Sequence, residues 1–156
     1  MFDGTKETFE MLKRPDTVKI ITIKNEKIVI LEQRQPHTDF FYDIPGGIHD
    51  AEGENELRAA QRELKEETGI ICAKWKLLKV VQTHSKIDSF VYNFLAYDVI
   101  KEVPQELDGG EVIKVHLMSL DEIKALKDDP KTRSLPLDIL NKVNSIKELF
   151  DLPEYS

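Results

Sequence analysis

Three glutamates, Glu63, Glu66 and Glu67, follow Arg62 at spacings that place their carboxylates close together on the surface of a helix. Residues three and four positions apart on an α-helix are surface neighbours, and like charges in such pairs repel by roughly a few tenths of a kcal/mol. A cation among the carboxylates would offset this repulsion, and hard divalent cations such as Mg²⁺ prefer oxygen ligands. The spacing therefore predicts a divalent metal site, with a solvated acidic helix face as the alternative.

The segment from Gly47 to Ile70 resembles the Nudix box, the signature of the Nudix hydrolase superfamily. That pattern is Gly, five residues, Glu, seven residues, and then Arg-Glu-apolar-x-Glu-Glu-x-Gly-apolar. Every fixed position from Glu54 to Ile70 matches it. Six residues instead of five separate Gly47 from Glu54, which we interpret as a one-residue insertion around His49 to Glu52.

The resemblance implies a metal site and names its ligands. Glu63 and Glu67 are expected to bind the ion directly, and Glu66 to bind it or to position a water molecule. The main-chain carbonyl of Gly47 is expected to complete the set. Mg²⁺ is the implied cofactor, with Mn²⁺ as an alternative ion. Bound divalent ions would neutralise the negative oxygens of a pyrophosphate and acidify the attacking water.

Three further residues of the box have implied supporting roles. Arg62 is expected to orient Glu63 through a bidentate contact and to limit repulsion among the carboxylates. It could equally form a simple surface pair with Glu66. Glu54 is expected to support the metal site or to interact with the helix N-terminus. Gly69 is expected to end the helix.

A general base is still required, and in many Nudix hydrolases it lies on a loop after the box. The glycine-containing segment Gln105–Glu111 is the candidate loop here. Glu111 is our first choice, because Glu-Val-Ile-Lys-Val resembles a Glu-x-Ile-x-Val stretch of ADP-ribose pyrophosphatases. Glu106, Asp108 and Glu66 remain alternatives.

Other segments resemble the ADP-ribose pyrophosphatase branch of the superfamily. Glu32–Pro36 is similar to its Glu-Gln-x-Arg segment, and Tyr42–Gly47 stands where the branch has Trp-Glu-Leu-Pro-Ala-Gly. We therefore expect Arg34 and Asp43 to contact the substrate. The Ser-Pro-Gly segment of that branch is missing, because Thr83–Asp88 contains no proline.

The resemblance implies hydrolysis of a pyrophosphate bond in a nucleoside diphosphate linked to another moiety, either ADP-ribose or a related nucleotide sugar. A nucleoside triphosphate pyrophosphatase is the alternative reaction. A nucleotide-binding sensor without turnover is an alternative of a different class, and the intact glutamates and Arg62 argue against it.

Sequence patterns predict the elements that must position these residues. Runs rich in β-branched residues on either side of Asn25-Glu26 predict a hairpin, and Pro45-Gly46-Gly47 predicts a turn. Asn55 is the expected helix N-cap. The predicted strands are Val18–Lys24, Ile28–Arg34, Phe40–Ile44, Trp75–Thr83, Ser89–Val99 and Val112–Leu117.

The box helix should bury Leu57, Ala60 and Leu64, which recur on one face. A capping box at Ser119 opens a second helix that runs to about Lys127, and a third is predicted over Leu135–Phe150. The predicted fold class is α/β (α+β), with a mixed β-sheet between helices. The resemblance implies the Nudix α/β/α sandwich with a loop-helix-loop catalytic motif.

Composition sets broader limits. The chain has 156 residues, the size of a single domain, and we expect one Nudix hydrolase domain over residues 1–156 with residues 1–16 as a short N-terminal arm. The net charge of −7 argues against nucleic acid as a partner. No segment is apolar enough to span or enter a membrane, and the single cysteine, Cys72, fits a cytoplasmic location. The resemblance implies a homodimer that acts on a small-molecule nucleotide.

Overall fold

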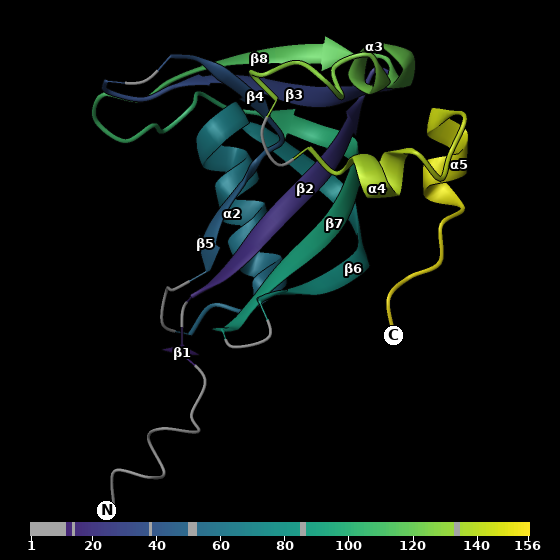
Figure 1. Cartoon of the computed structure of the whole chain (residues 1–156), viewed down its shortest axis with the longest axis horizontal. Helices are drawn as coiled ribbons and strands as arrows, with labels where there is room; N and C mark the ends of the chain where they lie inside the picture. The colour runs from purple at the N-terminus through teal and green to yellow at the C-terminus, as the bar shows by residue number, and fades with distance from the viewer. Residues whose placement is uncertain (1–11, 14, 38, 50–52, 85–86, 133–134) are drawn as a thin grey trace, which may run out of the picture.

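The computed structural model describes residues 12–13, 15–37, 39–49, 53–84, 87–132 and 135–156. Across these residues an eight-stranded mixed sheet forms the centre of the fold, with helices packed on it (Figure 1). No helix in this part of the chain has the length and hydrophobicity needed to cross a membrane. The expected N-terminal arm lies almost wholly outside the described residues.

The predicted hairpin is present as β2 (Asp16–Lys24) and β3 (Lys27–Arg34). Asn25 and Glu26 link the strands with φ values of 52° and 60°. Positive φ at both central residues is typical of the type I′ turn, whose twist matches that of two antiparallel strands. The turn thereby fixes the register in which Ile23 faces Ile28.

Strand β2 connects the two halves of the sheet. It pairs in parallel with β7 (Ile87–Glu102) and antiparallel with β5 (Gly46–His49). β7 also pairs antiparallel with β6 (Ile70–His84) and in parallel with the short β1 (Leu12–Lys13).

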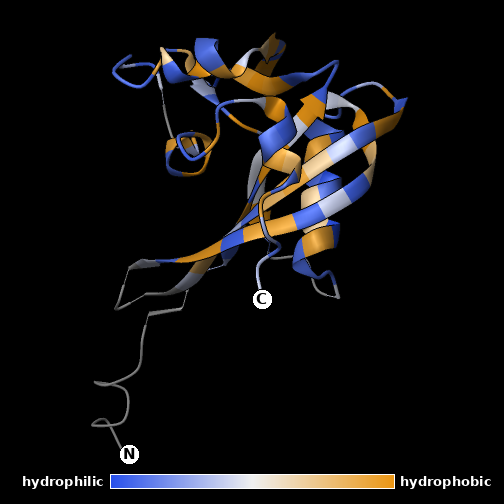
Figure 2. Ribbon diagram, turned by 90° about the vertical axis from the view of Figure 1, so that its right-hand side faces the viewer, coloured by the Kyte–Doolittle hydropathy of each residue, from blue (hydrophilic) through white to orange (hydrophobic). Residues whose placement is uncertain are grey.

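Strand β3 carries the other half of the sheet. It pairs antiparallel with β4 (Phe41–Asp43) and with β8 (Val112–Met118). Hydrophobic and hydrophilic residues alternate along many of the strands (Figure 2), as expected when successive side chains point to opposite faces.

The box helix is α2 (Glu56–Thr68), and both predicted caps are present. The side chain of Asn55 accepts a hydrogen bond of 2.8 Å from the backbone N–H of Arg58. Gly69 has φ 76° and its N–H donates to the carbonyl of Lys65 at 2.8 Å. These bonds satisfy backbone groups that a helix terminus leaves without partners.

The buried face of α2 differs by one residue from the prediction. Ala59, Ala60 and Leu64 are fully buried, whereas Leu57 is 37% exposed. Ala59 and Ala60 have short side chains, so the helix backbone lies close to the sheet, which includes the glycines of β5. Leu57 lies near the helix start on a face turned towards solvent.

Two hydrophobic clusters lie on opposite faces of the sheet, which confirms the predicted sandwich. One includes Ala60 and Leu64 of α2 together with Val18. The other includes Ile21 and Ile123, and it is closed by the short helices α3 (Leu120–Lys124), α4 (Leu137–Leu140) and α5 (Ile146–Phe150).

Several predicted boundaries were wrong. The expected helix over residues 135–150 is instead α4 and α5, because Asn144-Ser145 starts a new helix: the Ser145 hydroxyl accepts from the N–H of Glu148. β6 and β7 are longer than predicted, since their antiparallel pairing continues past the apolar runs. Gly46 and Gly47 were predicted to form a turn, and they are instead the first two residues of β5.

Candidate active site

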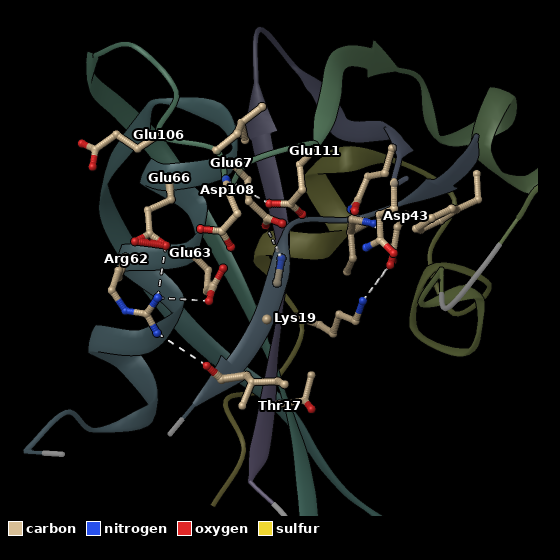
Figure 3. A pocket seen from close by; sticks show the side chains of 18 residues that line it. Thr17, Lys19, Asp43, Arg62, Glu63, Glu66, Glu67, Glu106, Asp108 and Glu111 are labelled. Atoms are coloured by element: carbon tan, nitrogen blue, oxygen red, sulfur yellow. Dashed lines mark hydrogen bonds and ion pairs between the residues drawn. The ribbon is translucent and has the colours of Figure 1, made fainter. Parts of the chain in front are cut away.

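A cavity of about 1070 Å³ opens between α2, the strands β2 to β5 and the loop before β8 (Figure 3). Two of the described residues that line it are basic, Lys19 and Arg62. Seven are acidic: Asp43, Glu63, Glu66, Glu67, Glu106, Asp108 and Glu111. The excess of carboxylates makes the cavity suitable for cations and unsuitable for a bare phosphate group.

Arg62 holds three carboxylates at one end of the cavity. Its Nε and Nη2 donate to the two oxygens of Glu54 at 2.9 and 3.1 Å, which is a bidentate pair. Its Nη1 donates to Glu63 and to Glu66, each at 3.1 Å. The bidentate partner is therefore Glu54, and Glu63 receives a single bond from the arginine.

Glu67 lies deeper than the carboxylates that contact Arg62. Its Oε1 accepts a hydrogen bond of 2.8 Å from the backbone N–H of Gly46 at the start of β5. The next residue, Gly47, lies against Glu63: a Cβ atom there would be 2.5 and 2.6 Å from the two carboxylate oxygens. A side chain at position 47 would displace the Glu63 carboxylate, so the observed position of that carboxylate requires glycine there.

Burial raises the pKa of two of these carboxyl groups. The pKa of Glu63 is about 7, because desolvation outweighs the stabilising charge of Arg62. The pKa of Glu67 is about 8, because desolvation outweighs the hydrogen bond from Gly46. Glu54 differs: its hydrogen bonds to Arg62 lower its pKa. The positive groups near Glu63 and Glu67 therefore do not fully compensate the negative charge of the two carboxylates.

These residues fit a divalent metal ion. Oxygen donors from α2 line one wall, two of them are desolvated acids, and Gly47 brings backbone close to Glu63. A hard cation would supply the charge that both acids require, and Mg²⁺ is bound by such oxygen sets.

We predict that Mg²⁺ affinity increases with pH. Glu63 and Glu67 must lose their protons to bind an ion, so the affinity should increase by up to about tenfold per pH unit for each proton released between pH 6 and 8. The measurement is calorimetric titration of the EDTA-treated protein with Mg²⁺ at several pH values. A constant affinity would contradict the assignment.

The stability of the EDTA-treated protein should show the opposite trend. Both carboxyls have folded-state pKa values above the ordinary 4.5, so folding takes up protons. The contribution of these two groups to the free energy of unfolding is therefore greatest below pH 4.5. It decreases as the pH rises to about 8. Added Mg²⁺ should remove this decrease, which thermal unfolding at pH 6 and 8 would measure.

The segment between β7 and β8 is fastened to the end of α2. The N–H of Val103 donates to the carbonyl of Gly69, and the N–H of Glu106 donates to the carbonyl of Glu66, each at 2.8 Å. Gln105 Nε2 donates to the carbonyl of Glu67 at 2.6 Å. The loop therefore supplies donors to carbonyls at the end of α2 and is held beside Glu66 and Glu67.

We predict that Gln105→Ala lowers kcat by roughly ten- to a hundredfold, because the loop loses the side chain that fixes it to α2. Mg²⁺ affinity should stay unchanged, since the carboxylates themselves are intact. Gln61→Ala, at an exposed position of α2, is the matched control. An unaltered kcat in a folded Gln105→Ala protein would show that the contact does not position the loop for catalysis.

The three loop acids proposed as the base all line the cavity. Two hydrogen bonds of 3.1 Å connect Asp108 and Glu111. The N–H of Asp108 donates to the Glu111 carboxylate, and the N–H of Glu111 donates to the Asp108 carbonyl. Glu106 is exposed. Figure 3 shows Asp108 and Glu111 directed towards the region of Glu63 and Glu67, and Glu106 farther out.

Arg34 is not brought together with the other predicted residues. It is exposed on β3 and is not among the residues that line the cavity, whereas its neighbours Gln33 and Gln35 are. Successive residues of a strand point to opposite faces, so the residues on either side of Arg34 face the cavity. The predicted substrate contact of Arg34 stays a prediction without support from its position.

Asp43 does line the cavity, and it is paired with a residue that sequence reasoning missed. Lys19 Nζ donates to both carboxylate oxygens of Asp43, at 2.9 and 3.1 Å. Lys19 is also opposite Gly46 in the β2–β5 ladder. Lys19 lies between Val18 and Ile20, which are buried, so its side chain points to the opposite face of β2. This alternation is the sequence feature that could have identified Lys19.

A second group of potential ligands lies outside the cavity. Asp16, His49 and Glu56 each place one ligand atom within 4.8 Å of the others. Asp16 already accepts a hydrogen bond from the N–H of Phe90, and His49 Nε2 contacts the carbonyl of Glu54. These contacts engage Asp16 and one ring nitrogen of His49, whereas His49 Nδ1 is buried without a hydrogen-bond partner among the described residues. The predicted insertion extends from His49 into residues 50–52, which lie outside the described residues.

The fold and the box carboxylates define the class of protein. A sequence profile of the NUDIX domain matches residues 13–137, which are most of the chain. The chain therefore belongs to the NUDIX domain family, as the resemblance of residues 47–70 predicted.

One known protein is similar to this chain over most of its length. The methanol dehydrogenase activator of Bacillus methanolicus is 32% identical over 124 residues, which are 77% of this chain and 66% of that protein. This chain thus spans just under two thirds of that relative's length.

Solved structures share the fold. A NUDIX hydrolase from Nitrosomonas europaea has a TM-score of 0.66 at 23% identity, covering 92% of this chain and 98% of its own. An ADP compounds hydrolase has a TM-score of 0.65 at 24% identity, covering 77% of this chain and 65% of its own.

Proposed function

We propose that this protein is a divalent-metal-dependent hydrolase that splits a pyrophosphate bond in a nucleoside diphosphate linked to another moiety, with ADP-ribose or a related nucleotide sugar as substrate. The observation that carries the proposal is the set of box carboxylates on one wall of the cavity, two of them desolvated and without a full complement of positive charge. A site of this kind favours a cation together with an anionic substrate.

In this proposal Glu63 and Glu67 hold Mg²⁺ or Mn²⁺, with Glu66 and the carbonyl of Gly47 as further ligands. A bound divalent ion would neutralise phosphate oxygens and lower the pKa of water. Arg62 orients Glu54, Glu63 and Glu66 through the bonds described above.

Glu111 is proposed to remove the proton from the attacking water. Asp108, Glu106 and Glu66 are the alternatives for this role. All four line the same cavity as the proposed metal ligands, which is the placement that a base acting on water in that cavity requires.

The proposal is tested by incubating the protein with and without Mg²⁺ against ADP-ribose, other nucleotide sugars, dinucleotides and nucleoside triphosphates, with products identified by mass. We expect Mg²⁺-dependent formation of a nucleoside monophosphate and a sugar phosphate. Release of pyrophosphate from triphosphates alone would favour the triphosphate pyrophosphatase instead.

A second candidate is a nucleotide-binding regulator that does not turn its ligand over. It is favoured by the name of the 32% identical relative, which describes an activator of another enzyme. Stabilisation by nucleotides without any product, from a protein that binds Mg²⁺, would support this candidate.

Other properties also belong to the proposal. We propose one Nudix domain over residues 1–156 with a short N-terminal arm at residues 1–16, a homodimer, and a cytoplasmic location. Size-exclusion chromatography with light scattering tests the dimer, since a monomer at working concentrations would exclude it.

A further inference from the structure

The cavity has two ends of different charge. Arg62 and the glutamates of α2 form one end. The other, here called the strand end, consists of Thr17, Lys19, Gln33, Phe41 and Asp43. Figure 3 shows Lys19 extending away from Arg62 and towards Asp43.

The charges of the strand end cancel. Lys19 and Asp43 form an ion pair of 2.9 Å whose side chains are 18% and 12% exposed. The Asp43 carboxylate also accepts a hydrogen bond of 2.8 Å from the N–H of Ile44, which fixes its orientation. The other three residues of the strand end carry no charge, so the described residues of this end are together neutral and polar.

The side chain of Lys19 is held in place along its length. Lys19 faces Gly46 across the β2–β5 ladder, and a Cβ on Gly46 would lie 2.9 Å from Lys19 Cδ. The alkyl chain therefore packs across a bare glycine, and the ammonium reaches Asp43. An ammonium has three N–H donors. Within the described part of the chain, the ammonium of Lys19 donates to the two carboxylate oxygens of Asp43.

The neighbouring strands place further binding groups at this end. Phe41 and Asp43 are two residues apart on β4 and thus point to the same face, and Gln33 is opposite Phe41 on β3. An ion pair, an amide, a hydroxyl and an aromatic ring offer hydrogen bonds and an apolar contact. A phosphate group would meet the Asp43 carboxylate within the same pair and would be repelled by it.

Building on the function proposed above, we propose that the Lys19–Asp43 pair binds the neutral part of the substrate beyond the pyrophosphate, a hydroxyl- or amide-bearing sugar or nucleobase, and does not bind a phosphate group. Lys19 is then a specificity-determining residue. The carboxylate end of the cavity would hold the pyrophosphate, and the strand end would select what is attached to it.

Two probes that resist hydrolysis separate these ends. Methylenediphosphonate contains only the bridged phosphorus groups, and α,β-methylene-ADP adds a nucleoside. With saturating Mg²⁺, calorimetry should show that the wild-type protein binds α,β-methylene-ADP at least about tenfold more tightly. In Lys19→Met the Kd of α,β-methylene-ADP should rise about tenfold, while that of methylenediphosphonate stays within about twofold.

Lys24→Met is the matched control. Lys24 lies on the same strand and pairs with Glu102 at 2.6 Å, outside the cavity. This variant should bind both probes as the wild type does. Because Lys19→Met removes the charge that Lys19 places beside Asp43, the double variant Lys19→Met/Asp43→Asn makes the pair neutral again, and it should also lose the preference for the nucleoside probe.

Each other outcome has a distinct meaning. An equal rise in the Kd of both probes in Lys19→Met would indicate that Lys19 contacts a phosphate group, and it would overturn the inference. Unchanged binding in both variants, or a wild type without preference for the nucleoside probe, would overturn it while leaving the proposed hydrolase in place. A wild type that binds neither probe with Mg²⁺ present would overturn the proposed function as well.

Discussion

Glu67→Gln should reduce kcat/KM by about a thousandfold, which corresponds to about 4 kcal/mol of transition-state stabilisation. The substitution removes a proposed metal ligand but keeps the shape of the side chain. The amide oxygen of glutamine can still accept the hydrogen bond that Gly46 donates to Glu67. Steady-state kinetics and Mg²⁺ titration would measure the loss.

The same variant should remain fully folded. The pKa of Glu67 is about 8, so in EDTA-treated protein at pH 7 this side chain is mostly uncharged, and a neutral isostere costs little. Glu102→Gln, an exposed glutamate outside the cavity, is the matched control and should keep full activity. A folded Glu67→Gln protein with wild-type turnover would remove Glu67 from the metal site.

Glu111→Gln should lower kcat by about a hundredfold or more, as expected when a general base is removed. Its effect on Mg²⁺ affinity should be small, because Glu111 lies on the loop before β8 and not on α2. The glutamine can still accept the hydrogen bond from the N–H of Asp108, so the loop should keep its shape. Measuring kcat and Mg²⁺ affinity for the same preparation separates these effects.

Two neighbouring variants complete this test. Asp108→Asn and Glu106→Gln change the other acids of the loop that line the cavity. If one of them causes the large loss of kcat and Glu111→Gln does not, the base lies on this loop but at another residue. Equal small losses in all three would direct attention to Glu66.

The parts of the fold set by local sequence were predictable. The Asn25-Glu26 turn, the Asn55 cap and the Ser119 capping box each depend on residues within a few positions, so their chemistry can be read directly. The break between α4 and α5 was missed because apolar residues recur at helical spacing across Asn144-Ser145. There, local side-chain bonds outweigh the periodic pattern.

The site was predictable in its carboxylates and less so in its surroundings. Glu63, Glu66 and Glu67 are close in sequence and lie on one helix, so their position beside one cavity followed from spacing. Lys19 and Asp43 are 24 residues apart, and Gln105 is 38 residues from the carbonyl it bonds. Such contacts depend on strand pairing and on side chain to backbone bonds, which leave no repeating pattern in a sequence.

The most direct test of the central claim is hydrolysis of ADP-ribose in ¹⁸O-labelled water, with and without Mg²⁺, followed by mass analysis of the products. We predict AMP and ribose 5-phosphate in equal amounts, one ¹⁸O atom in one of the two, and no reaction in EDTA. Equal rates with and without Mg²⁺, or no turnover of any pyrophosphate-containing nucleotide by folded, Mg²⁺-bound protein, would contradict the account.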